Sequence, residues 1–513
     1  MGRLRPGVAL ALSLTAVALL GLLVSVQPFT GDQALFASGA RQLAHGDVLY
    51  RDVWDVKQPG IYLWYLVGGA TVGYGETALH LFEVATLLAF GLFLGLSTRD
   101  RFGRPWIAAL VPLFVVGTYF ATAEPLQLGQ VESLAGIPIY LALWCGVRAR
   151  NGSRSWLVAA GVAGGVALVF KLALAPVVAA VWIVAIVPGR DERGPGSARR
   201  LARDGCALLA GAALPIAATL AYLASHDQLE TVRWTFFEVT PRATGLAGRP
   251  VRRLLDGGVR TAARWALPLA LAVVGAWHAR RRGWDRLEVG LLAWTVTAVP
   301  VLLVQHWWIY QYALVLPPIG VFAAAGVDAI VERRPSRRVI VALGIGAVVL
   351  AIPLGLRVAS NTQDLATHGF GRTPLQRRAL HADAEPHYRE ALAWARHLRG
   401  TPTPRGIYVL GNPLDVYVAG RRQSVAINGW SPEQYPPSVW RELRHQLSTA
   451  QPDEIVVDDF STAIMRERSP ATLRLVHRQY RRVGGRGPDT WYRRRADDGP
   501  PPARLDESSE VSP

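Results

Sequence analysis

Eleven apolar runs occupy most of the first 357 residues. They lie near residues 8–27, 77–97, 106–122, 131–147, 156–170, 172–188, 206–224, 263–279, 287–304, 308–331 and 338–357. A hydrocarbon core about 30 Å thick is crossed by roughly 20 helical residues. Since lipid offers no partner for a free backbone N–H or C=O, such runs are expected to be helical. The sequence therefore predicts an α-helical polytopic membrane protein with about 11 transmembrane helices over residues 1–358, and we expect the first run to stay as an uncleaved helix.

The distribution of basic residues predicts which side of the membrane each loop lies on. The chain has 55 Lys and Arg against 38 Asp and Glu, and the arginines cluster in short loops between apolar runs, which is typical of cytoplasmic loops. This patterning argues against nucleic-acid binding. Five such loops, 98–105, 147–156, 189–204, 278–286 and 331–338, fall on one side if the N-terminus is cytoplasmic. We therefore expect a plasma (inner) membrane protein with a cytoplasmic N-terminus.

One apolar stretch, residues 61–75, is shorter than the others and could span the membrane or lie along its surface. As a span it would place all five basic loops outside, so the arginines favour a surface helix on the outer side. The outer side then receives residues 28–75 as a large first loop, with 225–262 and everything beyond 358. The C-terminal part is thus predicted to be extracytoplasmic.

Beyond the last apolar run, alternation of strand and helix patterns predicts a small α/β domain. We expect a linker over 359–382, the domain over 383–495 and a disordered polar tail over 496–513. Within the domain the predicted strands are 405–411, 452–460 and an edge strand at 490–495. The predicted helices cover 431–450 and 469–484.

The first outer loop carries unusual charge for its place between apolar segments. Asp32 lies near its start and Lys57 lies further along it, and Lys57 is one of only two lysines in the chain, the other being Lys171. Apolar residues at helical spacing predict a short amphipathic helix through residues 32–46, lying on the membrane surface. Asp32 would open this helix, where a carboxylate serves as N-cap, so capping and catalysis both remain open for it.

The ordered segment "GDVLYRDVWDVKQPGIYLWYLVGGATVGYGETALHLFEV", following an acidic residue and a surface helix, resembles the first outer loop of the GT-C glycosyltransferases that use polyprenyl-phosphate sugars. The branch concerned is related to protein mannosyltransferases and lipid A aminoarabinose transferases. "GQVESLAGIPIYLALW", "AAGVAGGVALVFKLALAPVV" and "WWIYQYALVLPPIGVFAAAG" resemble later family segments. The resemblance covers roughly residues 1–330. It implies a GT-C fold and transfer of a sugar from a polyprenyl-phosphate donor to a glycan, lipid or protein acceptor of the cell envelope, with inversion.

The resemblance also implies roles for individual residues. Asp32 would be the base that deprotonates the acceptor, while Lys57 and Lys171 would bind the donor phosphate, although a lysine at the end of a span also snorkels readily. Glu132 would orient the acceptor or a metal, or simply open a helix. Further candidates for orienting the substrate are Asp52, Tyr310, Gln311 and His306.

Three departures from the family pattern leave the metal ligands unknown. Gln33 stands where a second acidic residue is common, Val56 precedes the lysine, and Gln58 replaces a proline. The sequence predicts no certain cofactor and leaves a divalent metal ion open. Two other functions remain open as well, a non-catalytic GT-C-like membrane scaffold and a lipid or glycan transporter, although a transporter would place charges at mid-membrane rather than at span edges.

Overall fold

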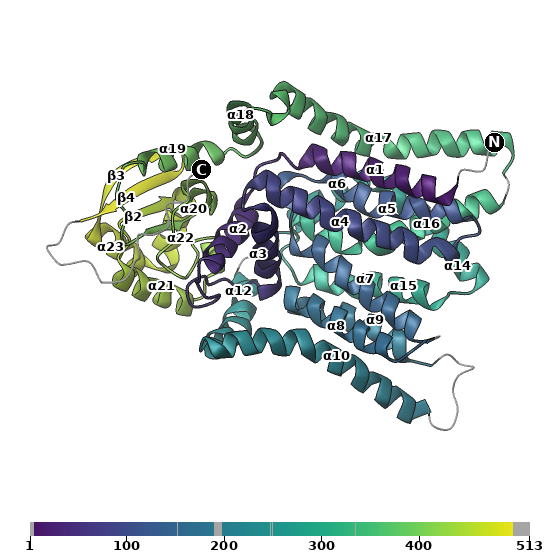
Figure 1. The fold of residues 1–513 in the computed structure, drawn as a ribbon. Coiled ribbons are helices and arrows are strands. Elements are labelled where there is room, and N and C mark those ends of the chain that lie inside the picture. The colour runs from purple at the N-terminus through teal and green to yellow at the C-terminus, as the bar shows by residue number, and fades with distance from the viewer. Residues whose placement is uncertain are drawn as a thin grey trace.

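In the computed structural model, which describes residues 5–150, 152–188, 197–246, 248, 250–333 and 335–495, long helices form a bundle with an α/β domain at one end (Figure 1). The predicted tail 496–513 and parts of four predicted cytoplasmic segments, at 1–4, 151, 189–196 and 334, lie outside the described residues. The helices of the bundle and its loops are α1 (Pro6–Val24), α2 (Gly31–Ala44), α3 (Pro59–Val72), α4 (Glu76–Thr98), α5 (Leu110–Pro112), α6 (Thr118–Thr122), α7 (Val131–Ala149), α8 (Ser155–Phe170), α9 (Ala175–Ile186), α10 (Ser197–Ser225), α11 (Leu229–Arg233), α12 (Thr240–Leu246), α13 (Val251–Arg264), α14 (Ala266–Arg282), α15 (Arg286–Leu303), α16 (Leu316–Glu332) and α17 (Arg337–Thr367).

All eleven apolar runs are helical. Among the described residues, eight helices are long and apolar enough to cross a membrane, and a ninth span results if α13 and α14, bent by 77°, are taken together. The runs at 156–170 and 172–188 form two shorter helices, which pack within the bundle against α7. The multi-pass membrane architecture is confirmed, with eight to nine full-length spans where about 11 were predicted.

Small residues bring several of these helices into close contact. A Cβ on Gly161 of α8 would lie 2.1 Å from the Leu208 carbonyl oxygen of α10, and one on Gly275 of α14 would lie 2.0 Å from the Phe322 carbonyl oxygen of α16. Lipid and leucine are equally apolar, so close backbone packing replaces hydrophobic burial as the force that joins helices in a membrane. These glycines therefore let the backbones of α8 and α10, and of α14 and α16, approach closely.

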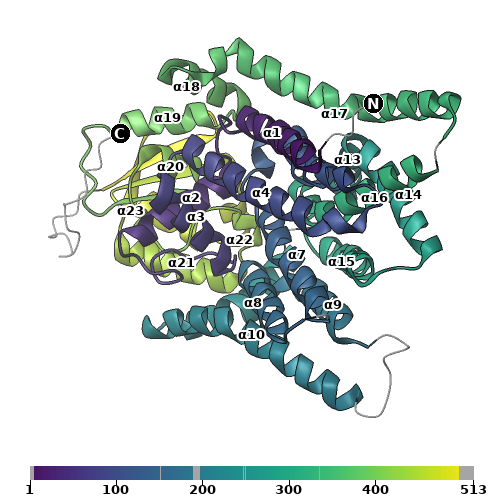
Figure 2. The same ribbon diagram turned by 45° about the vertical axis from the view of Figure 1, so that its right-hand side comes forward.

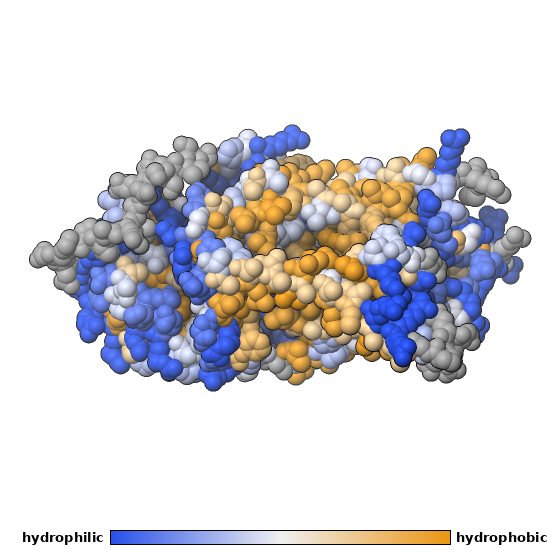
Figure 3. Space-filling view, turned by 60° about the horizontal axis from the view of Figure 1, so that its bottom comes forward, coloured by the Kyte–Doolittle hydropathy of each residue, from blue (hydrophilic) through white to orange (hydrophobic). Residues whose placement is uncertain are grey.

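The surface of the bundle divides into three zones. Figure 3 shows an apolar band across the middle, with hydrophilic residues at both ends. Large apolar side chains of the bundle helices, such as Leu214, Val273 and Ile345, are more than half exposed, as expected for a lipid-facing surface. The hydrophilic zone at one end belongs to the C-terminal domain, with α2 and α3 beside it in both ribbon views (Figures 1 and 2).

The 61–75 stretch forms helix α3, which begins with Pro59 and is too short to span a membrane. It packs against α2 and α4. Helix α2 differs from the prediction of a helix lying on the membrane surface, because its residues from Gly31 to Ala40 are all buried. It is buried because it packs against α3 and against residues 414–419 of the C-terminal domain.

The C-terminal domain follows a helical connection rather than an extended linker. Helix α17 continues past residue 358 to Thr367, and α18 (Pro374–Ala384) follows. The remaining elements are α19 (Tyr388–His397), β1 (Ile407–Leu410), α20 (Leu414–Ala419), α21 (Pro437–Ala450), β2 (Glu454–Asp458), α22 (Asp459–Arg468), α23 (Pro470–Gln479), β3 (Tyr480–Arg486) and β4 (Asp489–Arg494).

The four strands form one sheet in the order β1-β2-β4-β3, with β1 and β2 parallel. The prediction of an edge strand at 490–495 is wrong, because β4 lies between β2 and β3. The predicted helix 469–484 ends at Gln479, since residues from Tyr480 onward pair with β4 as a β-hairpin. Pairing with a neighbouring strand thus overrides the helical pattern of the sequence.

Hydrogen bonds join this domain directly to the first loop. The Trp54 amide donates to the Ala426 carbonyl at 2.8 Å, and Asn428 Nδ2 donates to the Trp54 carbonyl at 2.8 Å. The Tyr417 hydroxyl donates to the Tyr74 carbonyl at 3.0 Å. The first loop therefore lies between the bundle and the C-terminal domain.

Candidate active site

Asp32 lies in the first turn of α2 but does not cap it. Thr30 is the N-cap, and its amide donates to Gln33 Oε1 at 2.8 Å in a reciprocal capping box. The Asp32 side chain is free for other contacts, and Oδ1 accepts from Lys57 Nζ at 2.8 Å and from Trp430 Nε1 at 2.9 Å. Only 7 % of Asp32 is exposed. The local capping motif thus leaves a buried carboxylate for chemistry.

Lys57 lies in the segment between α2 and α3, with its ammonium also 4.8 Å from the centre of the Phe36 ring. Burial has the largest effect on the pKa of Lys57 and lowers it, but attraction to Asp32 and Asp55 outweighs burial, so the pKa lies above its ordinary value. Lys57 is therefore a cation at neutral pH. It is the partner of Asp32 and is itself available to an anion, since its side chain is 28 % exposed.

Asp55 supports this lysine from a buried position. Its Oδ2 accepts from the Tyr62 hydroxyl at 2.8 Å, and Oδ1 accepts from the Val56 amide at 2.7 Å. Burial raises the pKa of Asp55, and the Lys57 charge opposes that rise. Only 5 % of Asp55 is exposed, so this carboxylate is buried beside the lysine and does not lie in solvent.

A second lysine–carboxylate pair lies at the same end of the bundle. Lys171 follows the last residue of α8, and its Nζ lies 2.6 Å from Glu132 Oε1 and 2.7 Å from Gln305 Oε1. Glu132 is in the first turn of α7 and is 2 % exposed. Lys171 is thus held by two oxygen acceptors, unlike a snorkelling lysine that extends into water.

Tyr310 connects the two pairs. Its hydroxyl lies beside the Asp32 carboxylate, and both Asp32 and Glu132 act on it electrostatically. Glu132 also acts on the charge of Lys57. The structure therefore brings five of the residues predicted from the sequence, Asp32, Lys57, Glu132, Lys171 and Tyr310, into one region.

Two other predicted residues have structural contacts at the start of the 3-10 segment Ile309–Val315. Gln311 Oε1 accepts from the Trp308 amide at 3.1 Å and so caps this segment. The carbonyl of His306 accepts from Arg253 at 3.2 Å. These contacts shape the backbone that carries Tyr310.

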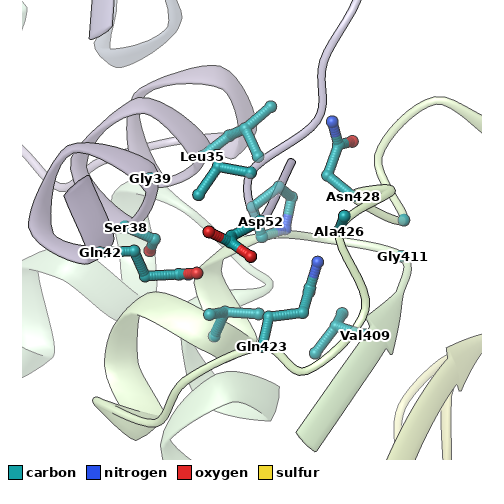
Figure 4. A pocket seen from close by; sticks show the side chains of 14 residues that line it. Leu35, Ser38, Gly39, Gln42, Asp52, Val409, Gly411, Gln423, Ala426 and Asn428 are labelled. Atoms are coloured by element: carbon teal, nitrogen blue, oxygen red, sulfur yellow. The ribbon is translucent and has the colours of Figure 1, made fainter. Parts of the chain in front are cut away.

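Asp52 lines a crevice between α2 and the C-terminal domain, separate from the Asp32–Lys57 pair. Its carboxylate accepts from the Val48 amide at 2.8 Å and from Arg51. Figure 4 shows Gln42 of α2 and Gln423 and Asn428 of the C-terminal domain around it. Neither Asp32 nor Lys57 lines this crevice. Asp52 therefore stabilises the turn formed by residues 48–52 of the first loop.

Two residues of the site were missed by the sequence analysis. Trp430 comes from the C-terminal domain, 398 positions from Asp32, and no local pattern in "INGWSPEQ" indicates its role. Gln305 marks the end of an apolar run, where a buried amide is a detectable signal, and its Nε2 donates to the Val301 carbonyl at 2.9 Å. The contact between Trp430 and Asp32 becomes apparent only in the tertiary structure.

Metal-binding geometry in the described part of the chain lies elsewhere. The histidine and carboxylate atoms that converge closely enough for an ion belong to His387, Asp415 and Asp489 of the C-terminal domain. At the candidate site, each carboxylate is already paired with a lysine. The two pairs can therefore bind an anion through their lysines, and they offer general-base chemistry through their carboxylates.

No family model and no curated protein matches this sequence. Two solved structures share its fold over nearly the whole chain. ArnT from Cupriavidus metallidurans bound to undecaprenyl phosphate superposes with a TM-score of 0.60 at 16% identity, covering 94% of this chain and 97% of that one. The apo state of the same protein gives a TM-score of 0.57 at 17% identity with the same coverage.

This likeness confirms the architecture predicted from the sequence, a helical membrane bundle with a large first loop and a small C-terminal α/β domain. At these identities the likeness establishes the fold, and the chemistry is argued from the two lysine–carboxylate pairs.

Proposed function

We propose that this protein transfers a sugar from a polyprenyl-phosphate donor to an acceptor of the cell envelope, with inversion at the anomeric carbon. The observation that carries the proposal is the buried contact between Asp32 Oδ1 and Lys57 Nζ at 2.8 Å, in the first loop of a GT-C fold. One carboxylate and one cation are the groups that a single displacement of a phosphate leaving group requires.

The reaction balances with these groups. The acceptor hydroxyl oxygen forms a bond to the anomeric carbon, and its proton passes to the Asp32 carboxylate. The bond between the anomeric carbon and the phosphate oxygen breaks, and the electron pair leaves with the polyprenyl phosphate. Its additional negative charge is stabilised by Lys57 and Lys171. No external oxidant, reductant or further reactant is needed.

The two lysines suit a lipid phosphate because they lie where the bundle meets the C-terminal domain. Lys57 is 28 % exposed and Lys171 22 % exposed in their side chains, so both are within reach of an anion at that level. Glu132 and Gln305 hold Lys171 in position before a donor arrives. The compact ammonium group of a lysine meets a phosphate oxygen as a point charge.

The proposed side of the membrane follows from the two ends of the bundle. The first loop and the C-terminal domain lie at one end (Figure 1), and the arginine-rich connections after α4, α14 and α16 lie at the other. Because short basic loops remain in the cytoplasm, the transfer site is proposed to face outward. The donor and acceptor would then meet on the outer face of the plasma membrane.

The proposal is tested by measuring sugar transfer in membranes that contain wild-type protein or Asp32→Asn. Radiolabelled polyprenyl-phosphate sugars are the donors, and envelope fractions supply the acceptor. Asp100→Asn removes an exposed carboxylate at the opposite end of the bundle and serves as the matched control. We expect transfer by wild type and by the control, and loss of transfer in Asp32→Asn at equal abundance.

A second measurement needs no acceptor. Purified wild-type protein is titrated with undecaprenyl phosphate, and Lys57→Ala is expected to weaken its binding. If wild type neither transfers a sugar nor binds this lipid, the glycosyltransferase proposal is wrong and a scaffold role is favoured. Lipid binding with movement of the labelled donor across the membrane, but without transfer, would favour the transporter.

A further inference from the structure

One edge of the C-terminal sheet gathers a histidine and two carboxylates that the proposed transfer reaction does not use. His387 Nε2 lies 3.0 Å from Asp415 Oδ2 and 3.6 Å from Asp489 Oδ2. His387 directly precedes α19, Asp415 is in the first turn of α20, and Asp489 opens β4. Three separate elements thus converge on one point.

The topology of the sheet explains this convergence. Strands β1 and β2 are parallel, so their carboxyl ends meet at the same edge, and Asp415 follows β1 by a short turn. Asp489 of β4 pairs in register with Asp458, the last residue of β2. The edge beyond the carboxyl ends of parallel strands is where α/β folds place their ligands.

The carboxylates at this edge are buried, and several of their oxygens accept no hydrogen bond from the described residues. Asp415 is fully buried and Asp489 is 3 % exposed. Asp415 Oδ1 and both Asp489 carboxylate oxygens have no hydrogen-bond partner in the described part of the chain, and neither does Glu390 Oε2. Among the described ion pairs, His387 alone reaches Asp415 and Asp489. A single imidazolium does not balance two buried carboxylates, and an uncompensated buried charge is strongly unfavourable.

Two glycines make room for further acidic groups around the same point. A Cβ on Gly411 would lie 2.9 Å from Asp458 Oδ2, and a Cβ on Gly487 would lie 2.6 Å from Glu390 Oε1. Both glycines also have positive φ, 156° and 56°. The turns after β1 and before β4 therefore bring their backbones close to carboxylates and leave no space for a larger residue.

We propose that His387, Asp415 and Asp489 bind a divalent cation in the C-terminal domain. Bonds of about 2.0–2.2 Å to imidazole and carboxylate ligands place neighbouring ligand atoms of a tetrahedral site about 3.3 Å apart, which lies between the two observed separations of 3.0 and 3.6 Å. A mixed set of one imidazole and two carboxylates suits Zn²⁺ or Mn²⁺ better than Ca²⁺ or Mg²⁺, which prefer oxygen alone.

The cation would stabilise the part of the C-terminal domain that contacts the first loop. It would tie the start of α19 to α20 and to β4. Helix α20 carries Tyr417, whose hydroxyl donates to the Tyr74 carbonyl, and Phe29 packs on the Tyr417 ring at a centroid distance of 5.2 Å. The site is thus a structural one, outside the Asp32–Lys57 pair but connected to it through α20.

The competing arrangement contains no metal. A protonated His387 between the two acids, with a proton on one carboxyl group, would also hold the three residues together. The two arrangements differ in metal content, which can be measured on the intact protein.

Full-length protein, purified in detergent, is treated with a chelator and separated from it by gel filtration, which also shows whether it remains folded. It is then supplied with micromolar Zn²⁺ or Mn²⁺ in the presence of excess Mg²⁺ and Ca²⁺, and bound metal is counted by mass spectrometry. We expect one ion per chain and a higher thermal midpoint of unfolding. Folded wild-type protein that takes up no Zn²⁺ or Mn²⁺ would overturn the proposal.

Two variants locate the site. Asp489→Asn preserves the shape of the side chain and is expected to weaken metal binding at least tenfold. Asp383→Asn changes an exposed acid of the same domain, which pairs with Arg389 and His368, and is expected to bind metal as wild type does. Unchanged binding in Asp489→Asn would place the ion elsewhere and overturn the assignment, whether or not sugar transfer is observed.

Discussion

The two lysines of the chain each hold a buried carboxylate, yet their surroundings differ. Glu132 lies on α7, Lys171 directly follows α8, and Gln305 completes their contacts from just beyond α15. Lys57 and Asp32 belong to the first loop, and Trp430 reaches them from the C-terminal domain. The first pair is formed within the bundle, whereas the second combines the first loop with the C-terminal domain.

This difference suggests a division of labour. A pair built on rigid helices is suited to hold a phosphate in a fixed position. A pair that the C-terminal domain contacts through Trp430 is suited to the proton transfer, because the domain helps to exclude water from the base. The following changes separate the two pairs, beginning with the largest expected effect.

Asp32→Asn is expected to lower the turnover of sugar transfer by about 10³-fold, because the amide cannot accept the acceptor proton. The side chain keeps its shape, so its contacts with Lys57 and Trp430 are only weakened. Turnover and the thermal midpoint of unfolding are measured together. A variant within about tenfold of wild-type turnover would show that Asp32 is not the base, and Glu132 would be examined next.

Lys57→Ala is expected to lower turnover by about 10²-fold, since one cation that stabilises the leaving phosphate is lost. Binding of undecaprenyl phosphate should weaken in parallel. Lys57→Arg restores the charge and should recover part of the binding but less of the turnover, because the guanidinium is wider and planar. Equal losses in both variants would mean that the Asp32 contact, rather than the phosphate, requires a lysine.

Glu132→Gln is expected to act on stability more than on chemistry. Removing the carboxylate leaves the Lys171 charge with Gln305, a loss of about 2 kcal/mol from a hydrogen bond to a charged group. The thermal midpoint should fall by several degrees, while turnover stays within about tenfold of wild type. A loss of turnover as large as that of Asp32→Asn would remove the proposed difference between the two pairs.

Trp430→Phe should have the smallest effect. The ring still packs on Gly31, where a Cβ would lie 2.3 Å from the indole, but the N–H that donates to Asp32 is lost. A net hydrogen bond of about 1 kcal/mol corresponds to roughly a fivefold change, which is measured as turnover. Unchanged turnover would show that the hydrogen bond from Trp430 to Asp32 does not contribute to catalysis.

Much of the fold could be predicted because hydropathy is a local property. Every apolar run became a helix, and the arginine-rich connections identified one end of the bundle. The prediction was weaker in the C-terminal domain, where residues 480–484 resembled a continuing helix but belong to β3, which pairs with β4. Strand pairing depends on residues distant in sequence, and a local pattern does not contain it.

The candidate site divides in the same way. The rarity of lysine pointed to Lys57 and Lys171, and a buried ion pair is found at each. The sequence left Asp32 open between an N-cap and a base, and the capping box of Thr30 with Gln33 decided against the cap. The roles assigned to Asp52, Gln311 and His306 stay predictions, and their observed contacts are with the local backbone or neighbouring arginines.

The sequence by itself determined that the chain is a bundle of membrane helices with a charged first loop and a separate α/β domain, because segment hydropathy and charge act where they occur. Only the tertiary structure decided which distant groups meet. Trp430 reaches Asp32 across 398 positions, and His387, Asp415 and Asp489 meet at one sheet edge. Such meetings depend on helix packing and strand order, and these are properties of the whole chain.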